Sequence, residues 1–371
     1  MNIAIDGNEA NVDKHVGVSV YTLELLKYFA KHADKDTTFT VFLKKSPKNF
    51  MPKENKYFSY DVVPAKILWS QIFLPYHLLF KKNIDIFFAP AHYSPRFLRQ
   101  KLVVTIHDLS YLYYPDEFLK KDLYKLDNWT KYSVQKAVKI IAVSKTTKKD
   151  IMLNLQISED KIKVIYNGYT EAVQSTINKQ NLLKKYHLKE RKFFLYVGTL
   201  QPRKNIATMI TAFSNFSAEN EDFKLVIVGK GGWLYRDIYQ QVTDLDLGER
   251  VIFTGFETDE NLAELYKNAF SLIMPSYYEG FGIPILEAMA HNCPVISSHN
   301  SSLPEVGGDA AIYFDPKDHK DLKNKMKELI NNQMLYSKLI SAGKKRIKDF
   351  SWKKCGQETL KLLKNAAHYE L

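Results

Sequence analysis

Two segments of the chain place charged side chains beside a glycine or proline directly after a predicted strand. In the first, the apolar run 193–197 leads into Gly198, and Arg203 and Lys204 follow just before a predicted helix. Two cations beside a helix N-terminus suit a diphosphate, because their charges, the backbone N–H donors and the helix dipole all attract an anion. A basic turn in which Asn205 caps the helix would explain the same residues, and the residues alone leave both interpretations open.

The second segment follows the predicted strand 271–274 and contains two carboxylates. Glu279 lies in a glycine-rich loop and Glu287 in the helix that Pro284 starts, so we expect both to face one pocket. A carboxylate accepts hydrogen bonds from two vicinal hydroxyls, as in a pyranose or a ribose. Glu287 could instead only compensate the helix dipole. A general acid/base pair would need one carboxyl held protonated, and the sequence shows no cause for that.

A histidine follows another predicted strand in the first half of the chain. His107 comes directly after the run 102–106, and ligands of parallel sheets bind beyond the carboxyl ends of the strands. A lone histidine at a strand end is more often structural, so the residue alone favours that interpretation over ligand contact. Asp108 would either orient the imidazole or cap the segment that follows.

The elements that must position these residues alternate along the chain. Short runs rich in Val, Ile and Phe alternate with stretches of helical periodicity, such as 18–33, 117–138 and 205–217, which predicts parallel sheets covered on both faces. The predicted strands are 2–5, 39–43, 60–63, 84–88, 102–106, 139–143 and 162–166, then 193–197, 224–228, 251–254, 271–274 and 294–297. The polar segment 169–192 is the predicted linker between two doubly wound halves.

Composition limits the class of protein. With 371 residues, 45% of them apolar, the chain can bury two cores. Cys293 and Cys355 have no metal-ligand spacing and lie in hydrophobic sequence, so we expect reduced, buried thiols in a reducing compartment. The start MNIAID leads straight into a strand, and no apolar run reaches the roughly 18 residues that span a bilayer. The expected location is cytoplasmic, with a peripheral contact with the inner membrane face left open.

The net charge of +12 is uneven. Residues 1–170 carry 26 Lys and Arg against 17 Asp and Glu, whereas residues 171–371 carry 27 against 24. A basic first half indicates an anionic partner or simply a solvated lysine-rich surface. No nucleic-acid motif accompanies the charge, so we expect no nucleic acid partner. The apolar stretch 69–82 could lie on a membrane, although a core-facing helix is the commoner explanation.

Taken together, these motifs resemble the retaining glycosyltransferase family four, which has the GT-B fold. The resemblance rests on Gly-Thr at 198–199, Pro-Arg-Lys-Asn at 202–205, Glu-Gly-Phe-Gly-Ile-Pro at 279–284 and Glu-Ala-Met-Ala at 287–290. Further matches are 229–231, 253–256, 293–296 and 303–306, and in the first half 106–109, 142–144 and 167–168. The resemblance covers residues 190–350 well and the first half more loosely.

The resemblance implies an architecture and an activity. Two Rossmann-like domains would face a deep cleft: an acceptor-side domain 1–170, completed by a crossover helix within 351–371, and a nucleotide-sugar-binding domain 190–350. The implied enzyme is a retaining, metal-independent hexosyltransferase of polysaccharide biosynthesis. Its best-matching donor is GDP-mannose, and its acceptor is a glycan or a lipid-linked glycan. No cofactor and no metal are expected.

The resemblance also assigns roles to residues of the second half. Arg203 and Lys204 would neutralise the diphosphate as it leaves, and Glu279 would hydrogen-bond the transferred sugar. Glu287 would hold the ribose hydroxyls. The remaining expected donor contacts are Gly198, Phe256 beside the nucleobase, and the backbone of Gly280, Phe281, Gly282 and Ile283.

Two residues of the first half complete the implied site. Gly17 would approach the diphosphate, although many relatives have two glycines where this chain has Val16 and Gly17. His107 would contact the donor sugar and support the reacting centre. It is not expected to act as a general base, because in the retaining mechanism the leaving phosphate accepts the proton of the acceptor.

Other classes of protein fit the sequence less well. An oxidoreductase would need a Gly-x-Gly-x-x-Gly motif after the first strand, where this chain has Asp-Gly-Asn at 6–8. The Asp-x-Asp segments 34–36 and 244–246 do not follow buried strands, so we expect solvated surface rather than a metal site. A nucleotide-sugar epimerase of the same fold, or a noncatalytic nucleotide-sugar-binding partner protein, remains open.

Overall fold

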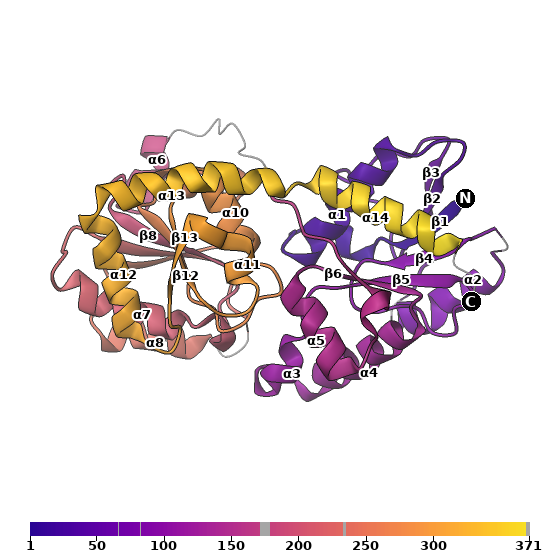
Figure 1. Cartoon of the computed structure of the whole chain (residues 1–371), viewed down its shortest axis with the longest axis horizontal. Helices are drawn as coiled ribbons and strands as arrows, with labels where there is room; N and C mark the ends of the chain where they lie inside the picture. Colours follow the sequence, from indigo (N-terminus) through magenta and orange to yellow (C-terminus); the bar gives the residue numbers. More distant parts are fainter. Residues whose placement is uncertain (66, 82, 171–178, 233–234, 369–371) are drawn as a thin grey trace. The chain divides into compact units, whose positions relative to one another are not determined.

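The computed structural model describes residues 1–65, 67–81, 83–170, 179–232 and 235–368, which form two compact units (Figure 1). The first unit comprises residues 1–113, 119–168 and 350–371, and the second comprises residues 114–118 and 169–349. The predicted linker 169–192 thus belongs to the second unit, and its described part contains α6 (Lys179–Lys185).

The first unit is built on a parallel sheet whose described strands follow the order β3-β2-β1-β4-β5-β6-β7. The strands are β1 (Asn2–Asp6), β2 (Thr38–Leu43), β3 (Phe58–Val62), β4 (Ile86–Ala89), β5 (Lys101–Ile106), β6 (Lys139–Ala142) and β7 (Ile162–Val164). All seven coincide with apolar runs of the sequence. All described pairs of these strands are parallel, which confirms the parallel sheet that the strand–helix alternation predicts.

Two helices of this unit, α1 (Val18–Lys31) and α14 (Trp352–Ala367), lie far apart in the sequence but pack against each other. The other described helices and turns are η1 (Asn8–Ala10), η2 (Trp69–Phe73), α2 (Leu74–Leu79), α3 (Ser110–Tyr113), α4 (Lys120–Lys136), α5 (Lys145–Leu155) and η4 (Glu159–Lys161). The C-terminal α14 packs against α1, where Gly356 lies so close to Tyr28 that a side chain would clash. Leu363 of α14 shares one buried cluster with Ile5 of β1.

The second unit contains a parallel sheet with the described order β10-β9-β8-β11-β12-β13. Its strands are β8 (Phe193–Val197), β9 (Lys224–Val228), β10 (Val251–Gly255), β11 (Ser271–Met274), β12 (Val295–Ser298) and β13 (Ala311–Phe314). The sequence analysis does not predict β13, although its four residues, Ala-Ile-Tyr-Phe at 311–314, are all apolar.

Helices and short turns complete the second unit. They are η3 (Pro115–Glu117), η5 (Pro202–Lys204), α7 (Ile206–Ser217), α8 (Arg236–Asp244), α9 (Asp259–Asn268), α10 (Ile283–Ala290), α11 (Leu303–Gly307), η6 (Gly308–Ala310), α12 (His319–Asn331), α13 (Gln333–Arg346) and η7 (Ile347–Asp349). The apolar stripe predicted for α7 is buried in full (Ile206, Met209, Ile210, Phe213 and Phe216). Burial of each such side chain stabilises the fold by about 1.5–3 kcal/mol.

Strand order in this sheet decides which loops meet. β11 lies between β8 and β12, and all three run parallel. The carboxyl ends of parallel strands lie at one edge of a sheet, so the loops that follow these strands lie side by side. The charged segments after 197 and 274 are therefore neighbours. No helix in the described ranges is long and apolar enough to cross a bilayer.

Candidate functional site

The loops after β8 and β11 are joined through backbone atoms. The Tyr277 N–H donates to the carbonyl of Arg203 at 2.9 Å. Asn205 stands at the N-cap position of α7 in the left-handed region, but its side chain makes no capping bond. Its Nδ2 instead donates to the carbonyls of Pro275 at 3.0 Å and Pro316 at 2.7 Å. The side-chain cap considered from the sequence is therefore wrong: the Asn205 side chain is held by these two carbonyls, and the bond to Pro275 joins the two loops.

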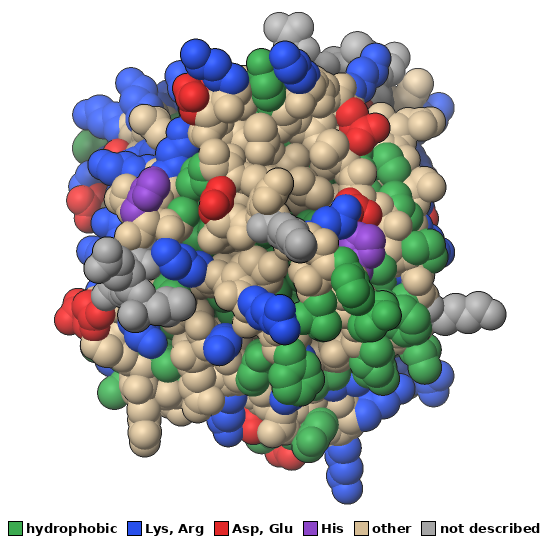
Figure 2. All heavy atoms as spheres, turned by 90° about the vertical axis from the view of Figure 1, so that its right-hand side faces the viewer, with side chains coloured by type: hydrophobic (Ala, Val, Ile, Leu, Met, Phe, Trp, Pro, Cys, Tyr) green, Lys and Arg blue, Asp and Glu red, His purple; other side chains and the backbone are tan. Residues whose placement is uncertain are grey.

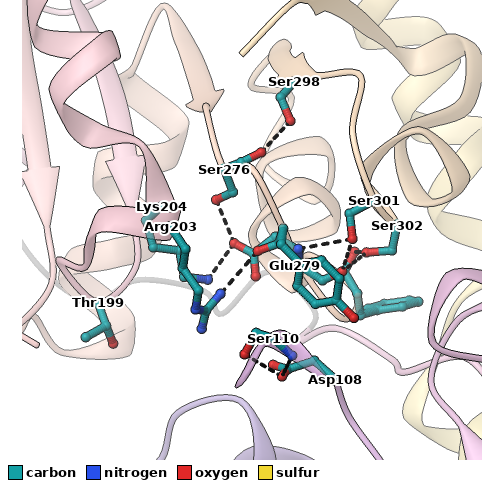
Figure 3. A network of polar contacts seen from close by, with 12 residues as sticks. Asp108, Ser110, Thr199, Arg203, Lys204, Ser276, Glu279, Ser298, Ser301 and Ser302 are labelled. Atoms are coloured by element: carbon teal, nitrogen blue, oxygen red, sulfur yellow. Dashed lines mark hydrogen bonds and ion pairs between the residues drawn. The ribbon is translucent and has the colours of Figure 1, made fainter. Parts of the chain in front are cut away.

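A buried ion pair lies where these loops meet (Figure 3). Nζ of Lys204 lies 2.5 Å from Oε1 of Glu279, with side-chain exposures of 13% and 11%. The Ser276 hydroxyl donates to the same oxygen at 2.8 Å. Burial alone would raise the pKa of Glu279, but the charges of Lys204 and Arg203 and two hydrogen bonds outweigh it and lower the pKa. Glu279 is therefore an ionised acceptor at neutral pH.

The two oxygens of Glu279 have different surroundings. Oε1 is occupied by Lys204 and Ser276, whereas Oε2 accepts no hydrogen bond from the described residues. Oε2 is not fully buried either, so a ligand can reach it. An ionised oxygen with unused lone pairs is a strong acceptor for a hydroxyl. The geometry thus combines a fixed cation and an open carboxylate oxygen on adjacent loops.

Serines from the loop after β12 hold the backbone of this carboxylate. The Ser301 hydroxyl donates to the carbonyl of Glu279 at 2.6 Å, and the Glu279 N–H donates to the same hydroxyl at 3.2 Å. The Ser302 hydroxyl donates to the carbonyls of Glu279 at 2.8 Å and Phe281 at 3.0 Å. The sequence analysis did not identify these serines. They follow the predicted strand 294–297, and a loop after that strand reaches the same sheet edge as Glu279, which could have indicated them.

Arg203 and Gly282 shape the rest of the loop. The Arg203 Nη1 donates to the carbonyl of Tyr278 at 3.1 Å, so its guanidinium lies against the Glu279 segment. Gly282 has a φ of 102° at the N-cap of α10, a conformation that a side chain would strain. A Cβ there would also lie 2.8 Å from Leu303. The bond from Arg203 holds the turn at Tyr278, and the contact with Leu303 restricts it at Gly282. This turn contains the expected backbone contacts Gly280, Phe281, Gly282 and Ile283.

Glu287 occupies a different environment from Glu279. Its Oε2 accepts a hydrogen bond at 2.9 Å from the hydroxyl of Tyr266 in α9, a partner that the sequence reading missed. Burial raises the pKa of Glu287 to about 7. A small pocket lies here, lined by Thr170, Asp259, Leu262, Ala263, Tyr266, Glu287 and His291. Glu279 does not line this pocket. Burial is the cause of the raised pKa of Glu287, and the sequence alone did not show that cause.

The raised pKa of Glu287 predicts a pH-dependent stability. A carboxyl whose pKa rises from 4.5 to about 7 on folding stabilises the folded state fully below pH 4.5, and this contribution is lost as the pH rises through 7. Glu287→Gln cannot ionise, so we expect wild type to lose stability relative to this variant across that window. Denaturant unfolding at a series of pH values measures the difference. A difference that does not change with pH would contradict the assignment.

The first unit contains the remaining titratable candidate, His107. The His107 Nε2–H donates to the carbonyl of Pro90 at 2.8 Å, and the ring packs edge-on against Tyr21. Burial, with a smaller contribution from the charge of His92, lowers the pKa of His107 to about 3. The imidazole is neutral at pH 7 and keeps Nδ1 as an acceptor. Asp108 accepts from the N–H and the hydroxyl of Ser110 at 2.9 and 2.7 Å, so it caps the segment that follows.

The other predicted positions lie at the ends of elements. Gly17 is the N-cap of α1 with a φ of 50°, and a Cβ there would meet open space. Gly198 follows β8 and its carbonyl lies against Gly229, where a Cβ would come within 1.9 Å. Phe256 follows β10 and is exposed. The Asp-x-Asp segments 34–36 and 244–246 are exposed, and no cluster of three metal-ligating side chains occurs within the described residues.

Comparisons with known proteins identify the family. The family model described as Glycosyltransferase Family 4 matches residues 16–172, and the one described as Glycosyl transferases group 1 matches residues 178–346. The O-antigen chain mannosyltransferase B of Escherichia coli is 30% identical over 283 residues, 75% of this chain and 74% of that protein. The chain belongs to the family-four glycosyltransferases.

A second relative agrees with this assignment, and a solved structure has the same fold. The O-antigen chain mannosyltransferase RfbU of Salmonella typhimurium is 34% identical over 240 residues, 64% of this glycosyltransferase and 63% of that protein. A sucrose-phosphate synthase from Thermosynechococcus elongatus matches with a TM-score of 0.77 at 20% identity, over 98% of each chain. At that identity the likeness shows the fold alone, and it confirms the predicted GT-B class.

Proposed function

We propose that this glycosyltransferase is a retaining, metal-independent hexosyltransferase that transfers mannose from GDP-mannose to a glycan or lipid-linked acceptor. The observation that carries the proposal is the buried pair of Lys204 and Glu279 beside Arg203. It provides two cations for a diphosphate and one open carboxylate oxygen for a sugar hydroxyl. The choice of mannose is supported by the names of the relatives, and the retaining outcome by the family resemblance.

Each residue then has a role in transfer. The bond between the sugar and the diphosphate breaks, and the cations of Arg203 and Lys204 stabilise the charge that develops on the leaving oxygen. The acceptor hydroxyl attacks on the same face, and its proton passes to the departing phosphate. Glu279 holds the sugar through Oε2, and Glu287 holds the ribose hydroxyls.

The remaining contacts are proposed to surround the donor. The backbone of residues 280–283 faces the sugar and phosphate, Gly198 allows close approach, and Phe256 borders the nucleobase. From the first unit, Gly17 approaches the diphosphate and His107 contacts the sugar. His107 serves through its neutral ring, because its low pKa excludes an imidazolium at working pH.

A donor screen tests the proposal. Thermal unfolding of the full chain with GDP-mannose, UDP-glucose and ADP-glucose should show the largest stabilisation with GDP-mannose, because a ligand that binds only the folded state raises the melting temperature. Stabilisation by a UDP- or ADP-sugar alone would overturn the choice of donor. An isomerised sugar formed from the donor alone would overturn transfer in favour of an epimerase.

Removal of metal should leave the activity intact. The two cations of Arg203 and Lys204 can neutralise the diphosphate, which is the task that Mg²⁺ or Mn²⁺ performs in metal-dependent transferases. Activity in excess EDTA should match the untreated enzyme, and added Mn²⁺ or Mg²⁺ should change it little. Complete loss in EDTA that either ion restores would show that a metal site has been missed.

We also propose that the first unit binds the acceptor and that this acceptor is anionic or presented at an anionic surface. The support is the charge of residues 1–170, where Lys and Arg exceed Asp and Glu by 26 to 17. Such an excess attracts anionic partners over a distance set by the ionic strength. A phosphate-bearing or lipid-linked glycan fits this requirement.

A further inference from the structure

The pocket beside Glu287 is lined mainly by two helices of the second unit. Its lining residues from α9 are Asp259, Leu262, Ala263 and Tyr266, and those from α10 are Glu287 and the C-cap residue His291. Three of these residues contact one another and form what we call the Glu287 cluster (Tyr266, Glu287 and His291). Because its members come from both helices, the packing of α9 on α10 fixes the arrangement.

The two carboxylate oxygens of Glu287 have different surroundings. Oε2 accepts the hydrogen bond from the Tyr266 hydroxyl at 2.9 Å, whereas Oε1 accepts none from the described residues. Oε1 is not fully buried, so a ligand in the pocket can reach it. An ionised oxygen with unused lone pairs is a strong acceptor for hydroxyl groups. The carboxyl group therefore offers one fixed oxygen and one open oxygen.

The Tyr266 hydroxyl acts as a constant donor to Glu287. Its side chain is 1% exposed, and burial, with a smaller contribution from the charge of Glu287, raises the pKa of the hydroxyl well above its ordinary value. The hydroxyl is therefore protonated throughout the working pH range. Oε2 of Glu287 is its acceptor in the part of the chain that the structure describes. The bond holds the orientation of the carboxyl group.

His291 holds the ring of Tyr266 in place without adding a charge. The two rings stack with centroids 5.6 Å apart and an angle of 15° between their planes. The His291 Nδ1–H donates to the carbonyl of Glu287 at 2.8 Å, and the proton is assigned to Nδ1 because a carbonyl can only accept. Burial lowers the pKa of His291, so the ring is neutral at pH 7. Glu287 thus gains a support on each side but no cationic partner from this ring.

The charged form of Glu287 depends on Tyr266. Burial raises the pKa of Glu287 to about 7, the hydrogen bond from Tyr266 lowers it, and the charge of Asp259 in α9 raises it slightly further. α11 and α13 also pack on α10, and no group of either acts on this carboxyl within the described residues. Glu279, in contrast, has the cation of Lys204 as its partner. A single hydroxyl therefore supports the ionised form of Glu287.

We propose that Tyr266 is a positioning residue for the ribose of the donor: its hydroxyl fixes Oε2 of Glu287 so that Oε1 faces the two ribose hydroxyls. The inference rests on the proposed function, from which it takes the contact between Glu287 and the ribose. It adds that recognition of the ribose depends on a residue of α9 that does not touch the ligand. A hydroxyl that only satisfied a buried polar group would affect stability and leave ribose recognition unchanged.

The affinity ratio of GDP to 2′,3′-dideoxy-GDP, measured by titration calorimetry over a range of pH, tests the inference. Both nucleotides carry the same base and diphosphate, so the ratio isolates the ribose hydroxyls and cancels the titration of the phosphates. For the wild-type chain we expect a ratio of about ten or more at pH 8, because hydrogen bonds to a charged group are strong. The ratio should fall through pH 7 towards lower pH, as Glu287 becomes protonated and its oxygens become weaker acceptors.

Tyr266→Phe keeps the stacked ring and removes only the hydroxyl. The midpoint of the pH dependence should rise by about one pH unit, because the variant loses the bond that favours the charged carboxyl. The ratio at pH 7 should fall by about fivefold, since the ionised fraction drops from about a half to about a tenth. In turnover assays the KM for GDP-mannose should rise and kcat should change little, because the ribose contact is the same before and during transfer.

Tyr313→Phe is the matched control, because it removes a hydroxyl that donates to the carbonyl of Gly308 at 2.8 Å in another part of the second unit. It should bind both nucleotides as wild type does, and thermal unfolding verifies that both variants are folded. Glu287→Gln should give a ratio that does not change with pH. If wild type discriminates between the nucleotides and Tyr266→Phe keeps its ratio and midpoint, the inference is wrong and the proposed function stands. A wild-type ratio near one at every pH would instead overturn the ribose contact of Glu287, and the inference with it.

Discussion

Lys204→Ala is expected to lower kcat/KM for the donor by about two to three orders of magnitude, because one preorganised cation facing developing charge contributes that much to turnover. The Lys204 ammonium is buried and fixed by Glu279, so it needs no reorganisation as the diphosphate leaves. The variant should also bind free GDP more weakly. Steady-state kinetics and titration calorimetry measure the two effects.

The same substitution leaves Glu279 buried without its partner, so the fold must be checked separately. Breaking a buried pair typically destabilises a protein by about 3–5 kcal/mol, and thermal unfolding shows whether the variant is folded at the assay temperature. The exposed Lys344→Ala in α13 serves as the control and should behave as wild type. If Lys204→Ala and Arg203→Ala both keep near-normal activity, the donor site has been placed on the wrong loops.

Glu279→Gln should separate sugar binding from diphosphate binding. We expect kcat/KM to fall by about two orders of magnitude, because a neutral amide is a weaker acceptor for a sugar hydroxyl than an ionised oxygen. The affinity for free GDP should stay the same or rise, because Lys204 loses its anionic partner and its charge becomes available to the phosphates. Lys204→Ala should instead weaken the binding of both GDP and GDP-mannose.

Calorimetric titration of Glu279→Gln with GDP and with GDP-mannose provides the readout. The difference between the two affinities should shrink relative to wild type, since only the sugar contact is lost. A variant that loses equal affinity for GDP and for GDP-mannose would show that Glu279 acts by positioning Lys204, and the proposed sugar contact would then be wrong.

Much of the candidate site could be predicted because it lies in continuous segments. Strand, glycine and helix signals follow one another after 193–197 and 271–274, which singles these residues out, and the family resemblance supplies their expected roles. That β8 and β11 are neighbours, and hence that Lys204 contacts Glu279, is a property of strand order. No local pattern encodes strand order.

What the sequence left undetermined depends on tertiary contacts. Asn205 matches a helix cap by type and position, yet it has a left-handed backbone and its Nδ2 donates to the carbonyls of Pro275 and Pro316, which hold the side chain in another orientation. The Ser301 hydroxyl is recognisable only once the loop after β12 is placed beside Glu279. The pKa of Glu287 depends on burial, which periodicity does not report.

The burial of the stretch 69–82 also could not be predicted from its sequence. Its apolar residues are compatible with a core helix or an interfacial one, and periodicity alone cannot say how many faces are covered. The structure buries Trp69 and Leu78 but exposes Phe73 and Phe80. Figure 2 shows hydrophobic side chains gathered into one area of the face that it views. Lys81, at the end of this stretch, is paired with Asp61 in the fold, and Lys82 lies outside the described residues.

A crystal structure of the protein with GDP-mannose bound would locate the donor directly. We expect diphosphate oxygens within hydrogen-bond distance of Lys204 and Arg203, a mannose hydroxyl on Oε2 of Glu279, and the ribose hydroxyls at Glu287. A nucleotide bound away from the loops after β8 and β11, or a mannose that does not contact Glu279, would contradict this expectation.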